Sequence, residues 1–139
     1  MRGKLRTRLT YADLDEFVEA FAEHGDWEGC TGIYGEPRGG LPIAVALSHA
    51  IGLPLLSAQS ETMLWVDDIV DKGETIERAL LVYPNAKYTA WVVRHYLRWS
   101  CMLQPGIILN DDRWIVFPWE RDENADADAA KYAASRAGL

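Results

Sequence analysis

Residues 64–75 constrain this chain more than any other stretch, because they join a buried strand, an acidic pair, a glycine turn and a helix start. The apolar run ending at Val66 is typical of a buried parallel strand, and Asp67 and Asp68 follow where we expect that strand to end. A turn centred on Gly73 then leads into a helix whose first backbone N–H groups favour an anion. Acidic side chains repel a phosphate, so their natural partners are vicinal sugar hydroxyls, a divalent cation, or both. The stretch therefore predicts a site for a phosphorylated ribose.

The same residues resemble the phosphoribosyl-pyrophosphate motif of the type I phosphoribosyltransferases. In that motif an apolar run, two acids and two apolar residues precede a glycine turn that ends in threonine. The resemblance implies that Asp67 and Asp68 bind ribose hydroxyls and Mg²⁺, and that Asp71 lies near purine N7 as a base or proton partner. It assigns the 5′-phosphate to the next four residues: Lys72, Gly73, Glu74 and Thr75. Lys72 departs from the motif, because threonine is usual at that position.

An alternative remains open for this stretch taken alone. Two acids after a strand also occur at the active-site edge of other α/β proteins, such as receiver-like and phosphatase-like acidic sites. A second segment is needed to choose between these hypotheses.

A second loop, at residues 35–40, has the composition of an anion site. A short strand candidate precedes it, and an apolar helix reaching Ile51 follows, with Pro42 suitably placed in its first turn. The loop resembles the pyrophosphate loop of the same family, which often reads Ser-Arg-Gly-Gly; the matching residues are Pro37, Arg38, Gly39 and Gly40. The peptide bond entering the arginine can be cis in that family, but this bond is not X-Pro and we do not assume it. An ordinary βα turn can also contain a Gly-Gly pair, yet two loops in the family's order favour the family.

Two later segments resemble the xanthine–guanine branch of the family. The strand expected at residues 87–93 ends at Arg94, where that branch has a lysine that hydrogen-bonds the purine 6-oxo group. Trp114 and Ile115 match its Trp-Ile pair, which supplies a stacking face and main-chain contacts to the base. Alternatively, Trp114 is an ordinary core tryptophan and Arg94 forms an ion pair at the strand end. The resemblance covers about residues 30–120.

The pattern of elements predicts an α/β fold with a mostly parallel central sheet flanked by helices. Residues 1–120 are expected to form the phosphoribosyltransferase-like domain, and the Ala/Asp-rich residues 121–139 a weak helix or mobile tail. Thr10 and Asp13 have the spacing of a capping box for a helix over residues 11–23. Further strands are expected at residues 52–56 and 107–109.

The loop between residues 52–56 and the central strand is much shorter than the resemblance implies. Many type I enzymes have a long flexible loop there that closes over the active site, whereas residues 57–62 leave room for little more than a turn. Three outcomes follow: slow and leaky catalysis, a cover supplied by a neighbouring subunit or by residues 121–139, or binding without turnover. We favour catalysis with help from a partner subunit, and expect a homo-oligomer, either a dimer or a tetramer.

Composition restricts the partners. A net charge of −7 argues against a nucleic-acid ligand, and no apolar run reaches membrane-spanning length. Cys30 and Cys101 do not form a Cys-x-x-Cys pair, so neither a zinc site nor a disulfide framework is expected. The chain also lacks the apolar segment of a secretory signal near its start, so we expect a cytoplasmic protein.

The resemblance implies an enzyme of purine salvage. It would transfer the phosphoribosyl group from 5-phosphoribosyl 1-pyrophosphate to a 6-oxopurine such as guanine, xanthine or hypoxanthine, releasing pyrophosphate with the aid of Mg²⁺. Asp67, Asp68 and Asp71 are the predicted catalytic residues. The alternatives are a non-catalytic, nucleotide-binding regulatory protein of the same fold and an enzyme that accepts a different base.

Overall fold

The computed structural model describes residues 6–121 and residue 131. These residues fall into two compact units: a central unit, Asp15–Asn110, and a terminal unit whose described residues are 6–14, 111–121 and 131. In chain order the elements are β1 (Arg6–Arg8), α1 (Tyr11–His24), β2 (Gly32–Gly35), α2 (Gly40–Ile51), β3 (Met63–Val70), α3 (Glu74–Val82), β4 (Lys87–Arg94), the 3₁₀ turn η1 (Tyr96–Arg98), β5 (Gln104–Leu109) and β6 (Trp114–Val116). The predicted boundary at residue 120 stays a prediction.

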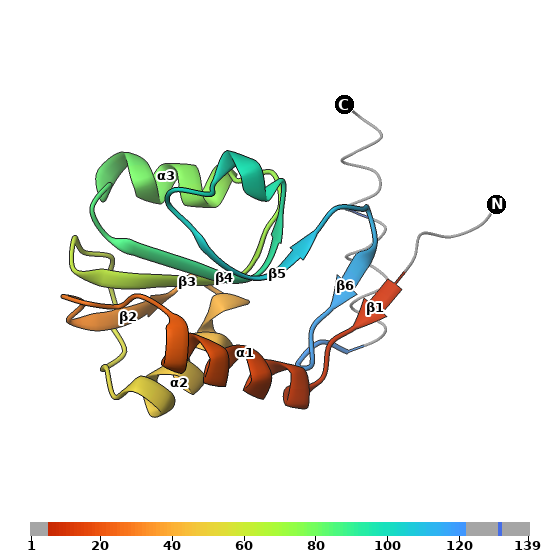
Figure 1. The fold of residues 1–139 in the computed structure, drawn as a ribbon, viewed down its shortest axis with the longest axis horizontal. Helices are drawn as coiled ribbons and strands as arrows, with labels where there is room; N and C mark the ends of the chain where they lie inside the picture. The colour runs from red at the N-terminus through yellow and green to blue at the C-terminus, as the bar shows by residue number, and fades with distance from the viewer. Residues whose placement is uncertain (1–5, 122–130, 132–139) are drawn as a thin grey trace. The chain divides into compact units, whose positions relative to one another are not determined.

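The central unit is built on one four-stranded sheet, in the order β2-β3-β4-β5, with every neighbouring pair parallel. Helix α3 covers one face of this sheet, and α2 lies on the opposite face with the part of α1 that begins at Asp15 (Figure 1). Parallel strands require such crossover helices, and their runs are apolar because both faces are covered. The predicted α/β fold with a parallel central sheet is confirmed.

Aromatic side chains fill both layers of the central unit. Beneath α3, Trp65 and Tyr88 pack with ring centroids 5.5 Å apart, and Ile76 and Ala79 of the helix are buried against the same cluster. On the other face, Phe17 of α1 packs on Trp91 of β4, with centroids 6.4 Å apart. Burying rings of this size contributes much of the energy that orders a sheet of only four strands.

The central strand β3 is longer than the sequence suggested. We expected it to end at Val66, before the acidic pair, but it continues to Val70. The reason lies in its two neighbours: β2 pairs with β3 only as far as Gly35 opposite Val66, whereas β4 continues alongside to pair Val93 with Val70. Asp67 and Asp68 therefore lie within a strand that has lost its partner on one side only.

Two other strand predictions needed correction. Residues 52–56 form no strand; Leu55 makes a single parallel bridge to Ile33, flanked by the hydrogen bonds Ile33 N–H to Pro54 O (2.8 Å) and Leu56 N–H to Ile33 O (2.7 Å). Pro54 has no N–H to extend this pairing. Strand β5 begins at Gln104 rather than residue 107, because an edge strand tolerates Pro105.

The terminal unit contains the two-stranded parallel sheet β1-β6, in which Thr7 pairs with Ile115. The predicted capping box is confirmed: Thr10 N–H donates to the Asp13 carboxylate (2.8 Å), and Asp13 N–H donates to Thr10 Oγ1 (3.1 Å). The predicted tail lies outside the described residues except for its first residue, Arg121, and Lys131. In the described part of the chain, no helix combines the length and apolar character needed to span a membrane.

Candidate functional site

The connections after β2 and β3 diverge at the carboxyl edge of the sheet. The chain leaves β2 towards α2 on one face, whereas it leaves the adjacent strand β3 towards α3 on the other (Figure 1). The bridge at Leu55 lies on the far side of β2, so the chain order reverses between β2 and β3. Such a switch point opens a crevice at the carboxyl ends of the strands, where open α/β sheets bind ligands. Both predicted anion loops lie at this carboxyl edge of the sheet.

The loop after β2 is anchored by Glu36. Its N–H donates to Val66 O (2.8 Å), its carbonyl accepts from Gly40 N–H (2.8 Å), and its carboxylate accepts from the buried Trp65 indole (3.2 Å). Beyond this anchor the Pro37–Arg38 peptide bond is cis, and the Arg38 side chain is exposed. The sequence did not establish the cis bond, and the role of Glu36 was not predicted from it. The available signal was an acidic residue directly before the Pro-Arg-Gly-Gly loop.

Gly39 brings this loop against the acidic pair of β3. A Cβ atom at Gly39 would collide with the Asp68 carboxylate, so no other residue fits without displacing one of them. Gly40 lies equally close to the β3 backbone at Val66 and Asp67. The structure therefore brings together two groups of predicted site residues that lie about 30 positions apart in the sequence.

The two carboxylates share one small volume. Asp68 N–H donates to Asp67 Oδ1, and Ile69 N–H donates to Asp68 Oδ1, both at 2.8 Å. Burial, followed by the neighbouring Asp68 and then Glu36, raises the pKa of Asp67 to about 9. A pKa this far above the ordinary value favours the protonated carboxyl of Asp67 at neutral pH. A cation or a set of hydroxyl donors would relieve this repulsion.

The donor set fits a magnesium ion shared with a substrate. Among the described residues, no group of three or more His, Cys, Asp or Glu side chains could enclose a metal. Mg²⁺ does not need such a cage, because it keeps several waters and uses one or two carboxylates together with substrate oxygens. Asp67 and Asp68 supply that number of carboxylates.

The loop after β3, residues 71–75, ends in the N-terminus of α3. Gly73 adopts φ +89°, a conformation that favours glycine, and it occupies the N-cap position without a side-chain cap. The first intrahelical bond runs from Glu77 N–H to Gly73 O (2.9 Å), so the amides of residues 74–76 precede it. Thr75 lies within the first turn, and the half-buried Lys72 ammonium makes no hydrogen bond or ion pair with other described residues. This geometry suits an anion.

Asp71 and Arg94 form an ion pair at the ends of β3 and β4, with Arg94 Nε 3.6 Å from Asp71 Oδ1. Arg94 is 3% exposed and Asp71 is half-buried. The two residues were predicted separately, as a base-binding donor and a proton partner, and the structure brings them together. A guanidinium has five N–H donors, so pairing with Asp71 leaves it chemically able to bind a second acceptor. Whether it contacts a base stays a prediction.

Trp114 and Ile115 lie in β6 of the terminal unit. Ile115 is buried and Trp114 half-buried. The site described here belongs entirely to the central unit, so their assignment to base binding also stays a prediction.

Residues 57–62 turn back before they reach the carboxyl edge. Leu55 pairs with Ile33, two residues short of the end of β2, and the chain then returns so that Thr62 O accepts from Thr31 N–H (2.9 Å). The two threonine hydroxyls are also bonded to each other at 2.7 Å. As predicted from its length, this segment forms no long lid.

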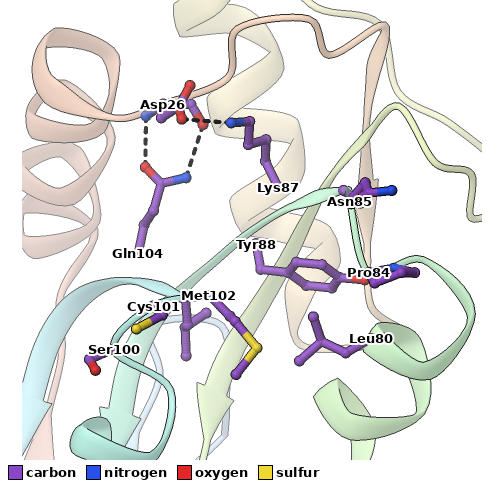
Figure 2. Close-up of a pocket in the computed structure, with 12 residues that line it drawn as sticks. Asp26, Leu80, Pro84, Asn85, Lys87, Tyr88, Ser100, Cys101, Met102 and Gln104 are labelled. Carbon is purple, nitrogen blue, oxygen red and sulfur yellow. Dashed lines mark hydrogen bonds and ion pairs between the residues drawn. The ribbon is translucent and has the colours of Figure 1, made fainter.

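A pocket of about 300 Å³ lies at the opposite edge of the sheet. Its lining includes Lys87 and Gln104, the first residues of β4 and β5, and Figure 2 shows Asp26 bonded to both side chains. Because parallel strands share their amino ends at one edge, this pocket lies away from Asp67 and Asp68 near the carboxyl end of β3. It is not part of the candidate site.

Comparisons with solved structures identify the fold. A purine phosphoribosyltransferase from Pyrococcus horikoshii is 27% identical, with TM-score 0.65, over 84% of this chain and 94% of that one. A xanthine-guanine-hypoxanthine phosphoribosyltransferase from Helicobacter pylori is 20% identical (TM-score 0.61; 88% and 99% covered). A hypothetical protein from Neisseria gonorrhoeae with bound ppGpp is 17% identical (TM-score 0.66; 96% and 99% covered). No family model and no curated protein matches the sequence. The chain has the type I phosphoribosyltransferase fold.

The raised pKa of Asp67 predicts a pH dependence of stability. Below pH 3.8 the carboxyl is protonated in both the folded and the unfolded chain. As the pH rises towards about 9, only the unfolded chain releases this proton, so the free energy of unfolding falls, by at most about 1.4 kcal/mol per pH unit. Asp67→Asn cannot ionise, so its stability relative to the wild type should increase with pH. Urea denaturation at pH 5 and pH 8 in EDTA measures this difference.

The matched control is Glu61→Gln, which removes an exposed carboxylate. Its effect on stability should not change with pH in this way. An Asp67→Asn difference that is equal at both pH values would show that Asp67 ionises normally in the folded protein.

Proposed function

We propose that this protein transfers the phosphoribosyl group of 5-phosphoribosyl 1-pyrophosphate to a purine base, with a 6-oxopurine as the preferred acceptor, and releases pyrophosphate. One observation carries the proposal: at the switch point, the Gly39 loop lies against the Asp68 carboxylate, while the same strand leads directly into the α3 anion loop. The acidic pair thus lies beside one predicted anion loop and in the strand that leads into the other. A ribose with a phosphate at one end and a pyrophosphate at the other has the complementary chemistry.

In this proposal the acidic pair holds the ribose. Asp67 and Asp68 would accept hydrogen bonds from the two ribose hydroxyls, and the same two carboxylates would hold Mg²⁺. When bound, Mg²⁺ neutralises charge on the departing pyrophosphate. Arg38 and the backbone amides of residues 38–40 bind the same leaving group, and the amides of residues 72–75 bind the 5′-phosphate.

The transfer breaks the bond between the ribose C1 and the pyrophosphate oxygen, and forms one between C1 and a purine nitrogen. Pyrophosphate leaves with the bonding electrons. The purine loses one proton, and the Asp71 carboxylate accepts it. The guanidinium of Arg94 beside Asp71 keeps a positive charge next to this carboxylate.

Acceptor preference follows from the chemistry of Arg94. Arginine only donates hydrogen bonds, so it favours a carbonyl at purine position 6 over the exocyclic amine of adenine. Arg94 is almost fully buried, so a purine that cannot accept its hydrogen bond would leave a buried donor unpaired, at a cost in binding free energy. This cost increases the preference for a 6-oxopurine.

A second candidate function is nucleotide binding without turnover. The observation that favours it is the short 57–62 segment, which cannot cover the crevice and exclude water from a charged transition state. The similar Neisseria protein with bound ppGpp has the same fold, which is compatible with this reading. In the catalytic proposal, a neighbouring subunit of a homo-oligomer supplies the cover.

Incubating the purified protein with donor, Mg²⁺ and a panel of bases separates the two functions. We expect pyrophosphate release and nucleotide products with guanine, hypoxanthine or xanthine in preference to adenine. Binding of donor and purine without pyrophosphate at any Mg²⁺ concentration would establish the second function instead. Products formed mainly with adenine would exclude the role of Arg94 in selectivity.

Asp68→Asn should weaken Mg²⁺-dependent donor binding by about tenfold or more, because a hydrogen bond to a charged group contributes about 1.5–3 kcal/mol. The fold should persist, since Asp68 is only half-buried. Calorimetry with and without Mg²⁺ measures this, with Glu61→Gln as a control of equal charge change. Equal donor affinity in the wild type and Asp68→Asn would remove Asp68 from the site.

Lys72→Thr restores the residue that is usual in the family motif and removes a charge beside the phosphate loop. We expect binding of ribose 5-phosphate to weaken by about fivefold at low ionic strength and less at high salt, because a partly exposed charge is screened. The exposed Arg78 of α3 provides the control Arg78→Thr. A loss that is independent of salt would contradict a direct charge interaction of Lys72.

A further inference from the structure

The connection after β4 folds back onto the phosphate loop, residues 71–75. It begins at His95, which has φ +55°, and continues through η1, where Trp99 N–H donates to Tyr96 O (2.7 Å). Trp99 is 3% exposed and packs in the core cluster with Val70 and Ile76, which flank the phosphate loop on either side. Residues 96–105 have no helical or alternating periodicity in the sequence, so this contact is known from the structure alone.

The indole ring of Trp99 lies directly against Gly73. A Cβ atom on Gly73 would collide with the six-membered part of the ring, and would also lie 3.0 Å from Cε2. The ring therefore occupies the space that a side chain would need. Gly73 is required here for this reason as well as for its positive φ.

The guanidinium of Arg98 contacts residues on both sides of Gly73. Its Nη1 donates to Lys72 O at 3.3 Å, and its Nη2 pairs with the Glu77 carboxylate in the first turn of α3. The guanidinium carbon also lies 4.9 Å from the centroid of the Trp99 ring. One side chain thus fixes the entry and the exit of the phosphate loop.

These contacts have two consequences for an anion bound by the loop. In a trans peptide the carbonyl and the next N–H point in opposite directions. Because Lys72 O is held towards Arg98, the Gly73 N–H points away from Arg98. In addition, Glu77 lies near the helix N-terminus, where its charge would repel a phosphate. Arg98 neutralises that charge.

We propose that Arg98, supported by Trp99, is a positioning residue for the 5′-phosphate: it acts through the loop and through Glu77 without touching the ligand. The proposal rests on the proposed function for the identity of the ligand. In this proposal one determinant of phosphate affinity lies in the connection between β4 and β5, outside both anion loops.

The test compares the wild type with Arg98→Met and Arg78→Met in the full-length chain. Both variants lose one exposed positive charge close to α3, but only Arg98 contacts the loop. Calorimetry gives Kd for ribose 5-phosphate and, separately, for pyrophosphate, and thermal melting reports the fold. Arg98→Met should raise Kd for ribose 5-phosphate about fivefold while leaving Kd for pyrophosphate unchanged, and Arg78→Met should alter neither.

A purely structural role would lower the melting temperature of Arg98→Met without this selective loss, and would overturn the proposal. So would an equal loss in Arg78→Met, which would attribute the effect to net charge. Wild-type protein that fails to bind ribose 5-phosphate would instead remove the proposed function, and the inference with it. If Arg98→Met does not fold, Arg98→Lys serves in its place, because lysine keeps the charge but cannot bridge both contacts.

Discussion

The contact between Gly39 and the Asp68 carboxylate determines the geometry of the candidate site. It exists because β2 and β3 are neighbours whose following connections leave to opposite faces, so the loop after β2 passes beside the strand that continues past it. The missing side chain of Gly39 lets an anion loop approach two carboxylates. Crowding of the carboxylates raises the pKa of Asp67 to about 9, through burial and then through the charges of Asp68 and Glu36. A ligand that brings both hydroxyls and a cation is the natural way to relieve it.

A second close contact, the ion pair of Asp71 and Arg94, lies where β3 and β4 end. Arg94 is almost fully buried, and removing the partner of a buried charge is strongly destabilising, so the two side chains hold each other in place. The acid that would accept a proton in the proposed reaction therefore lies beside a buried cation. The strand-end ion pair and the base-binding role, considered as alternatives for Arg94 from the sequence, are compatible in one structure.

The sequence located the two loops that the structure brings to one edge of the sheet, but it did not locate the strand boundaries around them. Loops with turn residues and a Gly-Gly pair carry a local signal, and so does the capping box of Thr10 and Asp13. The extension of β3 to Val70 had no such signal, because it depends on pairing with β4 some 23 residues later in the chain. The contacts of Arg98 and Trp99 with residues 71–75 were also not predictable, since the sequence from residue 96 to residue 105 has neither helical nor alternating periodicity.

The short segment at residues 57–62 determines what the fold can do with a reactive sugar. Because the chain turns back at the level of Ile33, this connection leaves the crevice at the carboxyl edge open on that side. An enzyme with an open crevice must limit hydrolysis by another means, either through a cover from outside the central unit or through rapid capture of the ribose by a base already in place. The proposed function takes the first route, with a cover from a neighbouring subunit, and in it the pair of Asp71 and Arg94 would help to order the purine.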